Sequence, residues 1–206
     1  MLKAFFLNLL HVYSNDVALN NKLWEDIENK YSNKKRHYHT LHHLENLLNE
    51  LSEVKPQIQN WDTILFTLFY HDVIYNTLKL DNEQKSADYA EQKMLMLSVP
   101  IDIISNCKKQ ILATQSHVFS TDSDTNLFTD ADLSILGYSH EAYTKYYQNI
   151  RREYNIYPDL VYNPGRKKVL LHFLNMEKIY KTPYFYNKYE SQARINLSEE
   201  LKILNR

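Results

Sequence analysis

Residues that break helices or form tight turns are scarce in this sequence. Of its 206 residues, only 2 are glycine and 5 are proline. Tight hairpin turns and the phosphate-binding loops of many nucleotide-binding folds both depend on glycine, because their backbones adopt positive φ angles. The composition therefore argues against a sheet protein and against a glycine-rich nucleotide loop, and it predicts an all-α fold.

An excess of one charge and long apolar runs are also missing. The chain has 24 Lys and Arg against 25 Asp and Glu, so no overall field attracts a nucleic-acid polymer or an anionic membrane. No run of about 18 apolar residues occurs, so we expect no membrane partner. The stretch from Met1 to Leu10 is apolar, but its spacing is helical and no small-residue cleavage site follows. It predicts a packed helix and not a secretory signal.

Cysteine is limited to Cys107, which excludes an internal disulfide. We interpret this residue as a small packed side chain. The absence of a disulfide framework is typical of a cytoplasmic protein, and a cytoplasmic location is our expectation.

Helical periodicity recurs along the chain without the shift in composition that would mark a second domain. We predict one compact helical domain over residues 1–206, with a functional core at about residues 36–140 and C-terminal helices, residues 140–206, packed on it. Asn163-Pro164 and Thr182-Pro183 each resemble a capping residue before a proline at a helix start. Residues 116–130, rich in Ser, Thr and Asp, predict a loop. Beyond the N-terminal helix, the expected helices are residues 17–31, 38–51, 61–75, 82–97, 101–114, 140–154, 166–180 and 184–204.

The most informative pair of residues is His71-Asp72, which ends an apolar run from Leu65 to Tyr70. The run predicts a buried helix. Burying a carboxylate beside an imidazole is costly unless something positive compensates it, and a divalent metal ion is such a partner. A satisfied structural pair is the alternative interpretation.

A histidine group at His39, His42 and His43 precedes that pair. His39 and His43 are four residues apart, so on a helix they project from one face and could serve one site, whereas His42 projects about 100° from His43. A solvated polar helix face is the alternative. Asp132 is followed by apolar residues, and a helix beginning near it could turn its carboxylate inward.

Two imidazoles and two carboxylates from these segments form a mixed nitrogen and oxygen ligand set. Such a set suits one divalent ion, with Mn, Fe, Co, Ni or Zn favoured over Mg because two ligands are histidines. Four protein ligands on an ion that prefers six leave positions open for water and substrate.

The order of His43, His71-Asp72 and Asp132 resembles the H…HD…D signature of the HD-domain superfamily of metal-dependent phosphohydrolases. Residues 38–43, YHTLHH, resemble the YHxxxH segment of cyclic-nucleotide phosphodiesterases, and residues 131–134, ADLS, resemble a later segment of those enzymes. The whole chain is similar to a bacterial subfamily of predicted HD phosphohydrolases. The residues after His71-Asp72 depart from the branch that cleaves cyclic dinucleotides, which has lysine and glycine there.

The resemblance implies an all-α HD-type fold and a metal-dependent hydrolase that cleaves a small phosphate ester, such as a nucleotide. It implies that His43, His71, Asp72 and Asp132 bind the metal and that His39 donates a proton to the leaving group. Asp72 could also orient or deprotonate the attacking water. Glu83 follows the family pattern as a further catalytic residue.

Substrate phosphate needs positive charge besides the metal. Arg36 and Lys85 are the candidate hydrogen-bond donors to a phosphate oxygen, and His117 is a candidate substrate contact. Solvated side chains are the alternative for all three.

Two other functions compete with hydrolysis. A di-iron oxygenase on the same scaffold needs further histidines between His71 and Asp132, where only His117 is available. A catalytically idle HD module that binds a nucleotide or a protein partner, with a structural metal, is the principal alternative.

Overall fold

The computed structural model describes residues 1–205, and over that range the chain consists of helices and turns without a β-strand. The all-α prediction is confirmed. Contacts within the chain group it into two compact units, Met1–Thr129 and Asp130–Arg206. Organisation as a single domain stays a prediction.

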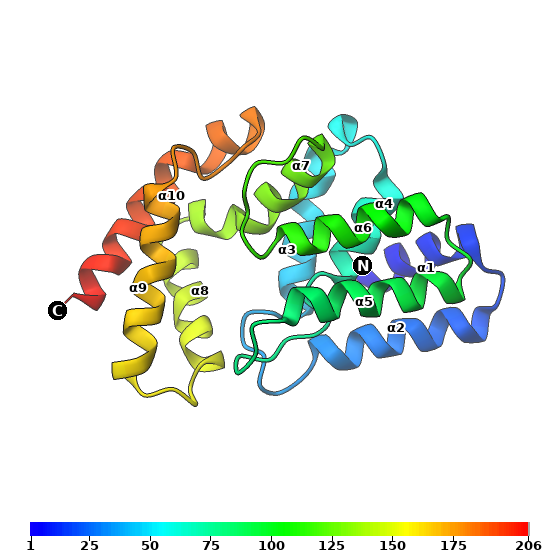
Figure 1. Cartoon of the computed structure of the whole chain (residues 1–206), viewed down its shortest axis with the longest axis horizontal. Helices are drawn as coiled ribbons and strands as arrows, with labels where there is room; N and C mark the ends of the chain where they lie inside the picture. The colour runs from blue at the N-terminus through cyan, green and yellow to red at the C-terminus, as the bar shows by residue number, and fades with distance from the viewer. Residues whose placement is uncertain (206) are drawn as a thin grey trace. The chain divides into compact units, whose positions relative to one another are not determined.

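The first unit contains six complete α-helices and one short 3-10 helix, and a further α-helix, α7, begins in it. Within this unit α5 and α6 lie side by side, and α1 packs with α2 (Figure 1). The elements are α1 (Leu2–Tyr13), α2 (Val17–Tyr31), α3 (Leu41–Glu53), the short 3-10 helix η1 (Lys55–Gln57), α4 (Trp61–Tyr70), α5 (Asn82–Met96), α6 (Ile101–Ala113) and α7 (Ser123–Asp132).

Helix α4 is the buried centre of the first unit. All its residues from Thr63 to Tyr70 are buried, as the apolar run predicts. The helix begins where the Asn60 side chain accepts a hydrogen bond from the Thr63 amide at 2.9 Å. Phe69 meets Phe6 of α1 edge to face, with ring centroids 4.7 Å apart. A helix buried on all sides holds the residues at its end in a fixed position.

The second unit holds the 3-10 helix η2 (Leu133–Gly137), α8 (His140–Glu153), α9 (Asp159–Asn175) and α10 (Pro183–Leu204). The buried carboxylate of Asp130 accepts hydrogen bonds from the Thr182 amide and hydroxyl, both at 2.7 Å, where α10 begins. The Asn196 side chain donates to the carbonyl oxygens of Leu136 and Tyr138 at 2.8 and 2.9 Å. These bonds hold η2 against α10.

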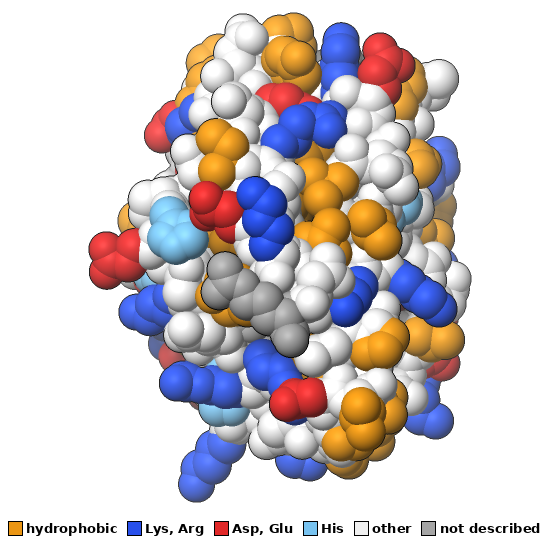
Figure 2. Space-filling view, turned by 90° about the vertical axis from the view of Figure 1, so that its left-hand side faces the viewer, with side chains coloured by type: hydrophobic (Ala, Val, Ile, Leu, Met, Phe, Trp, Pro, Cys, Tyr) orange, Lys and Arg blue, Asp and Glu red, His pale blue; other side chains and the backbone are white. Residues whose placement is uncertain are grey.

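The second unit also exposes apolar side chains on α9 and α10, among them Val169, Leu171 and Ile195. On the face drawn in Figure 2, apolar side chains are interspersed with Lys and Arg. Exposed apolar residues of this scattered kind are normal on protein surfaces and identify no partner.

The predicted start of one helix in the second unit is wrong. Helix α9 begins at Asp159, not at residue 166, because the Arg151 guanidinium bonds the Asp159 carboxylate at 2.7 Å in its first turn. Pro164 therefore lies inside the helix. The bond that it removes would end on the carbonyl of Leu160, a residue that is 91% exposed and accessible to water.

The predicted loop over residues 116–130 is also wrong in its second half, where α7 begins at Ser123. The Asp122 carboxylate accepts a hydrogen bond from the Thr125 amide at 2.9 Å and so caps this helix. Ser, Thr and Asp are favoured in helix caps as well as in loops, so their abundance did not distinguish the two. Asp132 consequently ends a helix, whereas the sequence suggested that one begins near it.

Over residues 1–205, no helix has both the length and the apolar character needed to cross a bilayer.

The close approach of η2 to α10 predicts that replacing each of the two glycines by alanine changes stability in opposite directions. A Cβ atom at Gly137 would lie 2.5 Å from the Tyr189 Cβ and 2.8 Å from the Tyr189 carbonyl oxygen, whereas one at Gly165 meets nothing within 4 Å. We expect Gly137→Ala to lower the free energy of unfolding by about 1–3 kcal/mol.

The matched control is Gly165→Ala, which we expect to raise the free energy of unfolding by about 0.5–1 kcal/mol, because alanine favours a helix interior. Urea unfolding of both variants measures the difference. Equal effects of the two substitutions would contradict the close packing at Gly137.

Candidate metal centre

Two buried histidines from different helices face each other in the first unit. His43 lies in the first turn of α3, His71 follows the last residue of α4, and their Nε2 atoms are 3.2 Å apart. The His71 Nδ1 atom is 3.0 Å from the Leu68 carbonyl oxygen. A carbonyl only accepts, so this contact places hydrogen on Nδ1, and Nε2 carries a lone pair when the ring is neutral. Metal-binding histidines are commonly oriented in this way.

The carboxylate of Asp72 is close to three imidazoles. Its Oδ2 atom is 3.3 Å from the His71 Nε2, 3.8 Å from the His39 Nε2 and 4.0 Å from the His43 Nε2. Burial by itself would raise the pKa of Asp72, but the charges of His71 and His39 in their protonated forms, and a hydrogen bond from protonated His71, hold that pKa well below its usual range. The carboxylate is therefore ionised at neutral pH and available to a cation.

The backbone segments that carry these residues are linked by Arg36. This guanidinium is buried and donates to the carbonyl oxygens of His39 and Val73, both at 3.1 Å, and it packs over the Tyr31 ring at 4.7 Å. Arg36 thus ties the residues before α3 to those after α4. The sequence predicted that Arg36 donates hydrogen bonds to a substrate phosphate. Two N–H groups of its guanidinium donate to the backbone, and phosphate binding by Arg36 stays a prediction.

His39 lies near the other two histidines, but not on their helix. Helix α3 begins at Leu41, so the predicted helix over residues 38–51 starts too early. The His39 ring packs against Tyr75 with centroids 4.2 Å apart and lies 5.9 Å from the His43 ring. The Arg36 contact with the His39 carbonyl holds a bent segment where a first helical turn was expected.

Glu83 is a half-buried carboxylate in the first turn of α5. Burial raises its pKa, its own backbone N–H partly opposes that shift, and the negative charge of Asp72 adds to it. The net result is a carboxyl group that binds its proton more tightly than usual. This property suits a residue that exchanges protons during catalysis.

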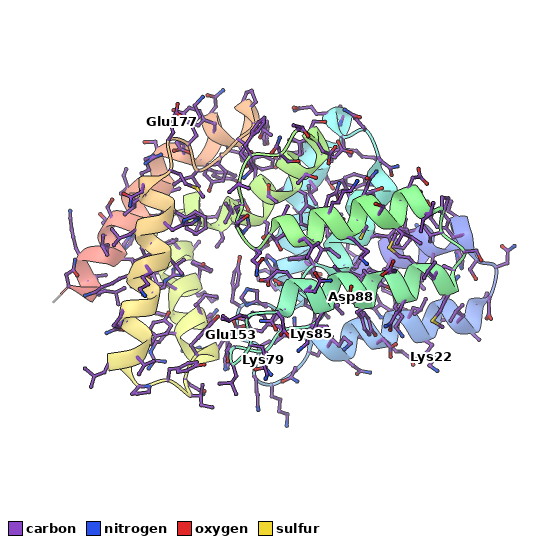
Figure 3. All side chains as sticks on the ribbon, viewed as in Figure 1. Lys22, Lys79, Lys85, Asp88, Glu153 and Glu177 are labelled. Atoms are coloured by element: carbon purple, nitrogen blue, oxygen red, sulfur yellow. The ribbon has the colours of Figure 1, made fainter. Side chains whose placement is uncertain are left out.

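Lys85 and His117 are the remaining residues that the sequence predicted to contact substrate. Lys85 is exposed and bonds the Asp81 carboxylate at 2.9 Å; Lys79 and Lys85 lie at the same end of α5 (Figure 3). His117 is half-buried, has a φ of 54° and ends α6 through a bond from its amide to the Ala113 carbonyl. Substrate contacts by Lys85 and His117 stay predictions.

Asp132 is the last residue of α7 and is half-buried. Binding of a metal ion by Asp132 together with His43 and His71 stays a prediction.

Sequence reasoning missed two residues that shape the segment after Asp72. The hydroxyl of Ser86, on α5, accepts from the Ile74 amide at 3.1 Å and donates to the Ile74 carbonyl at 3.3 Å. Tyr75 supplies the ring that packs on His39. Neither role has a signal in sequence spacing, because each contact joins two different segments of the chain.

Comparison of the chain with protein-family models, with curated proteins and with solved structures finds no match. Membership of the HD-domain superfamily therefore stays a prediction from the motif residues.

The raised pKa of Glu83 predicts that this carboxyl group affects the stability of the fold differently at acidic and neutral pH. A carboxyl whose folded pKa is raised contributes stability below its unfolded pKa of about 4.3 and loses that contribution as pH rises through the folded pKa. We expect Glu83→Gln to raise the melting temperature at pH 7 and to leave it nearly unchanged at pH 3.

Thermal unfolding followed by circular dichroism at both pH values measures this effect. Glu28→Gln, at an exposed site on α2, is the control and should show no such pH-dependent gain. A lower melting temperature of Glu83→Gln at pH 7 would contradict the unfavourable burial of the ionised carboxylate.

Proposed function

We propose that this chain is a metal-dependent phosphohydrolase that cleaves a phosphate ester of a small molecule, such as a nucleotide, in the cytoplasm. Its divalent metal would be held by His43, His71, Asp72 and Asp132. The observation that carries the proposal is the pair of buried imidazoles with Nε2 atoms 3.2 Å apart beside an ionised carboxylate. Imidazole nitrogens and carboxylate oxygens are the ligand types that Mn, Fe, Co, Ni and Zn accept.

Helix α7 supports the inclusion of Asp132. The Phe128 ring lies edge to face against the His71 ring, with centroids 5.5 Å apart. Asp132 follows Phe128 by four residues in the same helix, so the two side chains project from one face, one turn apart. This spacing supports the proposal that Asp132 serves the same ion as His71.

The polar residues around the histidines fit the steps of ester hydrolysis. A divalent metal bound here would lower the pKa of a coordinated water and polarise a phosphoryl oxygen. Asp72 would orient the water through its carboxylate. His39, with its Nε2 3.8 Å from Asp72, would protonate the departing oxygen, and Glu83 would take up a proton.

The charge of Arg36 supports an anionic substrate. Its guanidinium is buried and bonds two carbonyl oxygens, and no carboxylate lies within ion-pair distance of it among residues 1–205. A buried cation without a carboxylate raises the local potential. A phosphate group that enters this region would gain from that potential.

Substitution of a metal ligand tests the proposed function directly. We expect His71→Ala to lower metal-dependent hydrolysis of a panel of nucleotides and generic phosphate esters by more than about 100-fold, because losing a ligand costs more than losing a residue that orients one. The control is His42→Ala, since His42 is exposed on the same α3 turn as His43 and faces Glu45 at 3.8 Å.

Metal content is measured on the same samples. Equal hydrolysis by wild type and His71→Ala would exclude this site. A metal-loaded wild type that cleaves no ester in the panel would favour the idle module that binds a nucleotide or a protein partner.

The role of Arg36 is tested by exchanging it for lysine, which keeps the charge but cannot reach both carbonyl oxygens. We expect Arg36→Lys to lower kcat and metal affinity about 10–100-fold. Lys35→Arg, at the neighbouring exposed position, should change neither. A rise in KM alone, with metal affinity intact, would show that Arg36 binds substrate and does not order the histidine segments.

A further inference from the structure

Asp124 is a buried carboxylate that joins the start of α7 to the start of α4. Only 4% of its side chain is exposed. Its Oδ1 atom accepts a hydrogen bond from the Gln59 amide at 2.9 Å, and its Oδ2 atom accepts one from the Asn60 amide at 2.8 Å. Both amides immediately precede α4, where a negative charge also interacts favourably with the helix dipole. Each carboxylate oxygen is therefore committed to the backbone of another helix.

A second contact fixes the direction of α7 along α4. Phe128, one turn after Asp124, meets the ring of His71, which follows the last residue of α4. The two contacts lie at opposite ends of α4, so α7 advances along α4 in the same direction. Asp124, Phe128 and Asp132 are spaced by four residues and form one stripe along α7.

We propose that Asp124 is a positioning residue for the metal centre. It sets the register of α7 against α4 and thereby determines where Phe128 packs on the ring of His71. This inference rests on the proposed function, because it assumes that His71 binds the metal ion.

A neighbouring residue allows positioning to be separated from ordinary helix stability. Asp122 has the same side chain and caps the same helix, but its carboxylate bonds the amide and hydroxyl of Thr125, inside α7. Removing Asp122 weakens the helix start without breaking a bond to α4. Any effect of Asp124 that Asp122 lacks comes from the connection between the two helices.

The first measurement is the affinity for Mn²⁺ by titration calorimetry, at a temperature where every variant is folded. We expect Asp124→Ala to weaken binding about 10–100-fold, the range for residues that orient ligands. Asp124→Asn should lie in between, since its amide oxygen can accept one of the two bonds. Asp122→Ala should bind within about twofold of wild type, on the same scale of effects.

The second measurement needs no metal. The Phe128 ring shifts the NMR signals of the His71 ring protons, so these signals report the register of α7 on α4. We expect them to move in Asp124→Ala and to stay in place in Asp122→Ala.

The outcomes separate the two proposals. Failure of the wild type to bind Mn²⁺, Co²⁺ and Zn²⁺ would contradict the proposed function, while the NMR signals would still decide whether Asp124 sets the helix register. Unchanged His71 signals in Asp124→Ala, or equal loss of metal affinity in the Asp124 and Asp122 variants, would overturn the positioning role.

Discussion

Two buried imidazoles and a carboxylate share one small region of the first unit. The Nε2 atoms of His43 and His71 are 3.2 Å apart, and the His71 Nδ1 atom lies 3.0 Å from the Leu68 carbonyl oxygen, which orients that ring. The adjacent Asp72 carboxylate adds negative charge to the same place. We propose that a divalent cation binds all three groups.

The surrounding structure holds these groups in position. Helix α4 is buried on all sides and ends at the histidine, and the segments on either side of the site are fixed by Arg36 and Ser86 through backbone contacts. Glu83 is partly buried in the field of Asp72, which raises its pKa. Buried ionisable groups with shifted pKa values lower the stability of a fold, and they are often gathered at functional sites, where they contribute to reactivity.

Local patterns in the sequence were sufficient to predict much of the fold. The limits of α2 agree with its apolar periodicity, and α10 starts at the expected Thr182-Pro183 boundary. Prediction failed where one residue type has two uses. The Ser, Thr and Asp residues before Asp132 cap a helix at Asp122 instead of forming a longer loop, and Pro164 is tolerated inside α9 because it lies near an exposed helix end.

The candidate site was predictable only in part. The proximity of His43, His71 and Asp72 followed from the motif order, but the position of His39 outside α3 depends on the distant Val73 carbonyl that shares Arg36 with it. Contacts between segments far apart in sequence have no signature in the spacing of either segment. The bonds of Arg36, Ser86 and Asp124 all belong to this class.

X-ray absorption spectroscopy of the protein loaded with one equivalent of Co²⁺ tests the shared cation site most directly, because the scattering pattern of imidazole rings differs from that of water and carboxylate. We expect a coordination shell with two imidazole nitrogens and additional oxygens. A shell of oxygens alone, without imidazole scattering, would contradict a cation held between His43 and His71.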